Sequence, residues 1–287
     1  MKGIVRLIVL WIMTTIPMVC IGWFIGNKYG FGLYGPSIVF EVMVLSIIFI
    51  YFSSDNVILR RYQAKRISEE NHITRTVEEL AKKSEIPVPK IYLAETLMPA
   101  IFSIGRSPRH ASIVLTDSLI NLLDMDELVT VLAHEMYHIK SGDTLLGTIA
   151  AVIASPLTAI INTTSSYSFF VATIVAPPAA LIIRLTVPRS REHFADLKSV
   201  DIVGKPLKLI SALSKIQERL DSHDYRVNPS HVHLFILNPL RDNTLKMFGR
   251  NLPSYNKLFN THPPINERLN ILGITRVTHT EVDLNSL

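Results

Sequence analysis

Four long apolar runs are set among polar stretches of the chain, and they fall into two pairs. The first pair covers residues 7–25, which carry no charged side chain, and residues 31–52, where Glu41 is the single charge. A helix of 19 residues rises roughly 28 Å, close to the thickness of the hydrocarbon core of a bilayer. The two runs, joined by a short polar turn, predict a transmembrane helical hairpin that we assign to residues 1–53.

A cleaved signal peptide is the alternative for the first run. It fits less well, because the apolar stretch is longer than the core of such a peptide and no small-residue cleavage site follows it. Glu41 lies near the middle of the second run, where an ionised side chain is costly. It is either a functional group or a protonated acid packed against another helix.

The second pair is shorter and leaves two alternatives open. Residues 145–161 and 169–183 flank a polar turn, and runs of 17 and 15 residues are at or below the length that crosses a bilayer. Extension through Arg184 to residue 187 lengthens the last run, because an arginine near a helix end can reach the interface. Residues 142–188 therefore predict a transmembrane hairpin or a buried, re-entrant one.

Positive charges predict the side of the membrane on which the polar parts lie. Lys28 is the only basic residue in the turn of the first pair, whereas basic residues cluster at the outer ends of both pairs: Lys2, Arg6, Arg60, Arg61, Lys65, Arg66, Arg184, Arg189 and Arg191. Positive charge favours the cytoplasm. We therefore expect residues 54–141 and 189–287 to form two halves of one cytoplasmic domain.

These two halves predict a mainly α fold with a small β-sheet (α+β). Residues 54–86 follow a helical pattern that Pro87 and Pro89 end. Short apolar stretches predict strands at residues 91–93, 101–104 and 113–115.

Capping residues place the remaining helices. Thr116 or Asp117 caps a helix that runs to Leu123, and the next helix begins at Asp124 and ends at Gly142. The second half predicts helices at 189–203, 205–220 and 265–272, with a loop-rich stretch at 225–240.

Composition narrows the class of protein. The chain is 48% hydrophobic and 18% charged, with a mean hydropathy of +0.29, a net charge of +5 and a pI near 9.3. Low charge favours a membrane protein, and a basic balance suits an anionic membrane surface. No zinc-finger spacing or basic reading helix is present, so nucleic acid is not an expected partner. One cysteine excludes disulfides within the chain.

His134, Glu135 and His138 form an H-E-x-x-H motif on a predicted helix. Residues four apart lie on one helix face, so both imidazoles can bind one divalent ion, as in zinc peptidases. Glu135 lies beside that ion and can accept a proton from a water there. The alternative is a surface helix with two histidines.

A catalytic zinc needs a third protein ligand. The metzincin pattern is excluded, because Gly142 is one residue out of register and residue 145 is leucine. Glu192 is the best-placed distant carboxylate, and Asp196 can orient a zinc histidine through its far nitrogen.

These motifs resemble the HtpX family of integral-membrane zinc metallopeptidases, gluzincins related to the CAAX prenyl endopeptidases. The resemblance is carried, in order, by residues 134–138 (HEMYH), 191–196 (REHFAD), 228–230 (NPS), 234–236 (LFI), 238–240 (NPL), 261–264 (THPP) and 267–269 (ERL). Four apolar runs, one pair of them between the second and third ligands, also match.

The resemblance implies a gluzincin-type core with one zinc ion per subunit and Glu192 as third ligand. It implies Asp196 as the partner of a zinc histidine, and an edge strand at 100–103 where Ala100 and Phe102 contact an extended substrate. The family usually has asparagine where this chain has Pro99, which cannot donate a backbone hydrogen bond.

Four further histidines, His193, His223, His231 and His233, are expected to be ordinary polar residues. His262 and Arg268 are candidates for contacts to substrate or to the oxyanion. Their alternatives are structural: a capped loop for His262 and a surface ion pair for Arg268.

The expected function is that of a zinc endopeptidase in a prokaryotic plasma membrane, crossing it several times with the catalytic domain in the cytoplasm. The family implies polypeptide substrates, misfolded or damaged membrane proteins in particular, and a place in protein quality control and the stress response. Two alternatives remain: a peptidase that processes lipidated or signal-type termini, and a non-catalytic scaffold with a structural metal.

Overall fold

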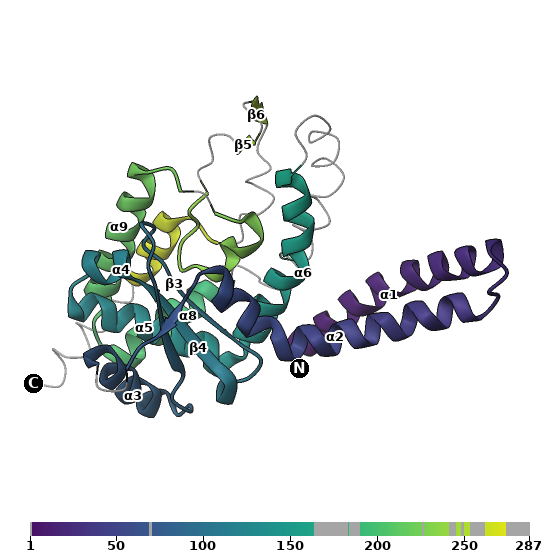
Figure 1. Ribbon diagram of the computed structural model, residues 1–287. Coiled ribbons are helices and arrows are strands. Elements are labelled where there is room, and N and C mark those ends of the chain that lie inside the picture. Colours follow the sequence, from purple (N-terminus) through teal and green to yellow (C-terminus); the bar gives the residue numbers. More distant parts are fainter. Residues whose placement is uncertain are drawn as a thin grey trace, which may run out of the picture.

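A computed structural model of the protein describes residues 2–68, 71–163, 183, 190–225, 227–240, 245–247, 250–252 and 262–273. Most of these residues are helical, and a small mixed sheet lies in the globular body (Figure 1). The predicted α+β class is therefore confirmed for the described part of the chain.

The sheet has four strands in the order β1-β2-β4-β3. β1 (Lys65–Arg66) is antiparallel to β2 (Lys90–Ala94), β2 is parallel to β4 (Ala111–Thr116), and β3 (Ile101–Gly105) is antiparallel to β4. The short 3₁₀ helix η1 (Pro108–His110) joins β3 to β4. β3 is thus an edge strand, as expected for its residues.

Two N-terminal helices, α1 (Lys2–Lys28) and α2 (Tyr34–Arg61), form a hairpin that projects from the body (Figure 1). They cross closely at glycines: a Cβ added to Gly35 would lie 2.3 Å from the carbonyl oxygen of Gly22. Large apolar side chains on both helices are exposed, and Glu41 is exposed too. The role of Glu41 therefore stays a prediction.

Among the described residues, one helix is long and apolar enough to cross a membrane, and it is α2. This helix continues to Arg61, beyond the change to polar residues at position 54. The expectation of a helix throughout 54–86 is wrong in the middle: Gln63 has a positive φ of 49°, β1 follows, and α3 (His72–Ser84) begins afterwards. Tertiary contacts explain the break, since the Tyr62 ring packs at an angle against Phe102 and edge-on against Phe235.

Local capping explains the helices around the motif. Thr116 caps α4 (Asp117–Leu122) by accepting from the Leu119 N–H. Asp124 and Glu127 form a reciprocal capping box at the start of α5 (Met125–Ser141). Gly142 ends α5 in the left-handed conformation with φ of 77°. The predicted start and stop of this helix are confirmed.

The third apolar run forms α6 (Asp143–Thr163), which leaves the body at a steep angle to the α1–α2 hairpin (Figure 1). Most of the fourth run lies outside the described residues. Beyond it come α8 (Ser190–Val203), α9 (Pro206–Ser222), the 3₁₀ helix η2 (Pro229–Leu234) and a helix at 265–273, all near their expected positions. The small β5–β6 hairpin (Leu245–Met247 and Arg250–Leu252) was not expected.

The hydroxyl of Thr116 joins the edge strand to α4. It accepts from the N–H groups of Ala100 (2.9 Å) and Leu119 (3.3 Å) and donates to the Ala100 carbonyl (3.2 Å), and the residue is buried. Thr116→Val keeps the shape of the side chain but removes the hydroxyl that accepts from the Ala100 and Leu119 N–H groups, while the Ala100 carbonyl keeps its bond from the Thr116 N–H. We expect a loss of about 1–3 kcal/mol in unfolding free energy, measured by denaturant unfolding in detergent.

Thr76→Val is the matched control, because that hydroxyl makes an exposed bond within α3 to the carbonyl of His72. Equal unfolding midpoints for the two variants would contradict the role given to Thr116.

Candidate metal centre

α5 presents His134 and His138 on one face, one helical turn apart. Their ring centroids are 4.8 Å apart and their Nε2 atoms 3.1 Å apart. The side chain of His134 is fully buried and that of His138 is 14% exposed. Two imidazoles held this closely in a buried position are already arranged as a pair of ligands.

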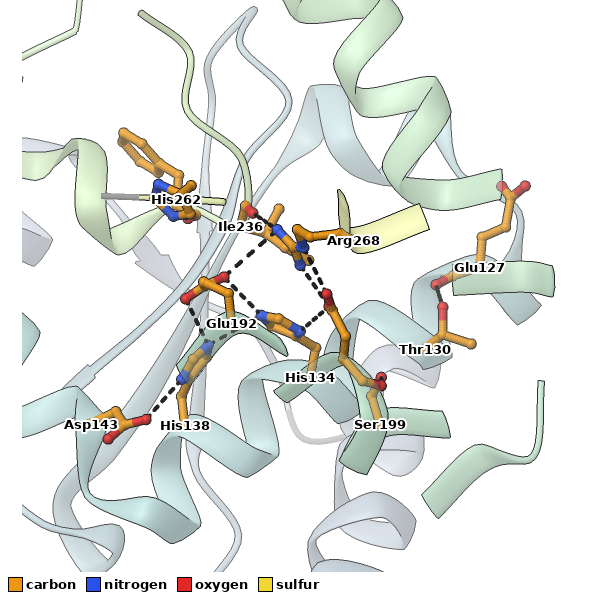
Figure 2. Close-up of polar contacts among 12 residues, drawn as sticks. Glu127, Thr130, His134, His138, Asp143, Glu192, Ser199, Ile236, His262 and Arg268 are labelled. Carbon is orange, nitrogen blue, oxygen red and sulfur yellow. Dashed lines mark hydrogen bonds and ion pairs between the residues drawn. The ribbon is translucent and has the colours of Figure 1, made fainter. Parts of the chain in front are cut away.

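α8 packs against α5 and brings Glu192 to the same point (Figure 2). Its carboxylate oxygens lie 3.6 Å from His134 Nε2 and 3.5 Å from His138 Nε2. One ligand atom from each residue falls within 4.8 Å of the other two. The expected grouping of two histidines and a distant glutamate is therefore present.

The spacing of these atoms fits a zinc ion. Ligands about 2.0–2.1 Å from a tetrahedral centre are about 3.3–3.4 Å from one another. The two Nε2 atoms are 3.1 Å apart, and each lies near a different Glu192 oxygen, Oε2 at 3.6 Å from His134 and Oε1 at 3.5 Å from His138, so these nearest separations bracket that value. Glu192 Oε2 is buried without a hydrogen-bond partner among the described residues. Three electron-pair donors that converge in a buried place are satisfied by a cation.

Asp196, one turn after Glu192 on α8, lies behind the first histidine. Its Oδ1 is 3.0 Å from His134 Nδ1. Arg268 donates to both Asp196 oxygens, at 2.6 and 2.7 Å, and also to the carbonyl of Ile236. The alternative that Arg268 forms a surface ion pair is wrong, because its side chain is fully buried.

Asp143, the first residue of α6, lies behind the second histidine. Its Oδ2 is 3.3 Å from His138 Nδ1 (Figure 2), and its Oδ1 pairs with Arg191. From the sequence, Asp143 was not singled out as a site residue, and Arg191 was noted only as a positive charge and as part of the 191–196 motif. A carboxylate directly after the helix break, five residues from a ligand, was the available signal.

The acidic groups set the charge state of the site. Burial raises the pKa of Glu192, but the hydrogen bond and charges of the neighbouring histidines hold that pKa well below its usual value. Burial lowers the pKa of His134, yet Asp196 and Glu192 outweigh it and raise this pKa to about 9. The site thus stabilises positive charge, such as that of a bound metal ion.

A small cleft, partly open to solvent, is lined by the three ligands. Glu135 lines this cleft and is otherwise buried. Ser103 of β3 and His233 of η2 line it too. Glu135 is therefore next to the metal-binding atoms without being among them, as its place in the motif predicts.

His262 and Arg268 lie close to the ligands, but their hydrogen bonds are to backbone carbonyls and to Asp196. The Nε2 atom of His262 contacts the carbonyl of Phe235 at 2.7 Å, and burial lowers the pKa of the ring. Arg268 NH1 is 3.7 Å from Glu192 Oε2. Both side chains thus support the segment after η2, and a direct contact with substrate stays a prediction.

The register of β3 decides which of its backbone groups are free. Ala100 exchanges bonds with Thr116, so residues 100, 102 and 104 turn their backbone groups towards β4. Ile101, Ser103 and Gly105 turn theirs outwards, and the Gly105 N–H accordingly donates to Thr148 of α6. The outward edge therefore lies one residue away from Ala100 and Phe102.

The remaining histidines have structural contacts. His231 Nδ1 is 2.9 Å from the Tyr62 hydroxyl and its Nε2 is 2.9 Å from Ser155 Oγ. His233 Nε2 contacts the Gly147 carbonyl, and burial lowers its pKa to about 4. His193 pairs with Glu267, and His223 stacks on Tyr225. His233 also lines the cleft, a position that was not expected from the sequence.

Comparison with known proteins gives a consistent result. The sequence model described as Peptidase family M48 matches residues 68–274. A protein described as "Protease HtpX homolog" from Pyrococcus furiosus is 37% identical over 281 residues, which cover 91% of this chain and 94% of that protein. A homolog of the same description from Thermodesulfovibrio yellowstonii is 34% identical over 286 residues, covering 92% and 95%.

Among solved structures, that of S. mikatae Ste24p is similar with a TM-score of 0.49 and 19% sequence identity. The similarity covers 94% of this chain and 65% of that one.

The buried pair of Arg268 and Asp196 gives a stability prediction. Arg268→Met leaves the Asp196 carboxylate buried without its cation, which costs about 3–5 kcal/mol of unfolding free energy. Thermal unfolding in detergent measures the effect. Lys198→Met, which removes an exposed ion pair with Asp201, should change the unfolding temperature little. Equal shifts for both variants would show that burial of the Arg268 pair is not what matters.

Proposed function

The chain belongs to peptidase family M48 and is a zinc metalloendopeptidase, and from this premise we propose that it cuts polypeptides at the cytoplasmic face of a prokaryotic plasma membrane. The substrates proposed are misfolded or damaged membrane proteins. The observation that carries the proposal is the His134–His138–Glu192 cluster with Glu135 beside it, in a body from which an exposed apolar hairpin projects. The proposed stoichiometry is one zinc ion per subunit.

His134, His138 and Glu192 would hold zinc through the three atoms that already converge. Three protein ligands leave one coordination position open, which is typical of catalytic zinc. When bound, zinc lowers the pKa of a water molecule and polarises a carbonyl group. Asp196 lies on the Nδ1 side of His134, so that the Nε2 atom of this ring faces Glu192.

Glu135 is the proposed general base and acid. Its position in the cleft allows its carboxylate to accept a proton from the attacking water and then to pass that proton to the leaving amine. Removal of this group should slow the reaction strongly while the ligands remain in place.

The outward edge of β3 is the proposed place for an extended substrate. The backbone groups of Ile101 and Ser103 face this edge, although both residues are buried, and Ser103 lines the cleft. Ala100 and Phe102, which the resemblance implied as substrate contacts, turn their backbone groups towards β4 and are not proposed for this pairing. Pro99 belongs to the outward set, so this edge has one donor fewer at that end.

The membrane location is supported by the α1–α2 hairpin. Its exposed side chains include Trp23, Phe24 and Phe49, and α2 has the length and apolarity of a membrane span. Water disfavours such a surface. Whether residues 142–188 also cross the bilayer stays a prediction, and so does the cytoplasmic position of the body.

Glu135→Gln tests the chemistry. The variant should keep zinc at one ion per chain and lose cleavage of an unfolded polypeptide by about 10²–10⁴-fold, the usual contribution of a general base. Metal analysis and a fluorescent cleavage assay measure the two quantities. Glu95→Gln is the control, since Glu95 is exposed and bonded only to Lys65 among the contacts described. Retained cleavage by Glu135→Gln in a clean preparation would refute its role.

The single cysteine makes the membrane topology testable. In a Cys20→Ala background, Leu33→Cys places a thiol in the exposed turn of the hairpin, and Lys82→Cys places one on α3. A membrane-impermeant thiol reagent should label Leu33→Cys in intact cells and Lys82→Cys only after lysis. The reverse labelling pattern would mean that the body lies outside the cytoplasm.

A further inference from the structure

We propose that Asp143 is a positioning residue for the second metal ligand, His138, and that Arg191 holds Asp143 in place. One Asp143 oxygen faces His138 Nδ1 at 3.3 Å (Figure 2), and the other pairs with Arg191. The side chains of Asp143 and Arg191 are 11% and 18% exposed. The inference rests on the zinc site of the proposed function and adds two residues to it.

The arrangement repeats that of the first histidine. Asp196 contacts Nδ1 of His134 and is paired with Arg268. In the same way, Asp143 contacts Nδ1 of His138 and is paired with Arg191. In both, a carboxylate faces Nδ1 and so favours the imidazole form whose Nε2 lone pair faces Glu192. Carboxylates in this position orient zinc histidines and raise their basicity.

The two supports differ in strength. The Asp143 contact is longer than the Asp196 contact, 3.3 against 3.0 Å, and it is less buried. Charge interactions weaken as water approaches. We therefore expect loss of Asp143 to weaken metal binding without preventing the fold, which makes it the better residue for an experiment.

The position in the chain gives this pair a second consequence. Asp143 directly follows the cap residue Gly142 of α5, and Arg191 directly precedes Glu192 on α8. Residues 144–190, which make up most of the chain between the second ligand and the third, are thus flanked by the two members of this ion pair. The ion pair therefore joins the end of α5 to the start of α8 next to the metal-binding residues.

A charge at the start of α6 is the simpler role for Asp143. That role predicts a change in folding stability but no specific change in metal affinity. The experiment must therefore measure both quantities on the full-length protein.

Zinc affinity is measured by competition with a chelator for the wild type, Asp143→Ala, Asp143→Asn and Arg191→Gln. We expect Asp143→Ala to bind zinc about 10–100-fold more weakly. Asp143→Asn should recover part of the loss, because its amide oxygen can still accept from His138. Asp201→Asn on α8, an exposed partner of Lys198, is the control and should leave zinc affinity unchanged.

Thermal unfolding of the metal-free proteins separates positioning from folding. The proposal expects metal-free Asp143→Ala to unfold close to the temperature of the control. It also expects Asp143→Ala combined with Arg191→Gln to lose little more zinc affinity than Asp143→Ala alone, since both act through one contact. Zinc affinity within twofold of wild type, or a loss matched by an equal fall in metal-free stability, would overturn it. A wild type that binds no zinc would instead refute the proposed function.

Discussion

The contact between α5 and α8 is the constraint on which the site depends. Two ligands belong to one helix and the third to another that begins 49 residues after the first ends. Catalytic geometry tolerates errors of only about 0.5 Å, so the packing of these helices must be fixed independently of the chain between them. Buried residues of α8, Glu192, Asp196 and Ser199, lie on the face towards α5, and the same face thus carries both packing and chemistry.

Burying these charged groups costs free energy that hydrogen bonds and ion pairs must offset. Asp196, Arg268 and Glu192 are all almost completely buried. Each is held by a charged neighbour, yet buried ion pairs contribute little net stability over apolar packing. Their presence is therefore explained by the demands of the metal, and metal binding and folding are linked in such a site.

Local sequence signals predicted much of this structure because their physical causes are local. Asp124, Glu127 and Gly142 set the ends of α5 through contacts within a few residues, and the spacing of His134 and His138 needs only helical geometry. Resemblance pointed to Glu192, which the spacing of residues alone left as one candidate.

What the sequence did not predict depends on contacts between distant segments. The break after Arg61 follows from Tyr62 packing against Phe102 and Phe235, and the pairing of Asp143 with Arg191 follows from the approach of α6 and α8. The free edge of β3 depends on its register with β4, where a shift of one residue exchanges the bonded and free groups. The network of Tyr62, His231 and Ser155 has a mechanical consequence: it links the base of the hairpin and α6 to the wall of the cleft. A change in the tilt of α2 relative to the body would then strain these hydrogen bonds. Through the contact of Tyr62 with Phe235, it would also shift the wall of the cleft.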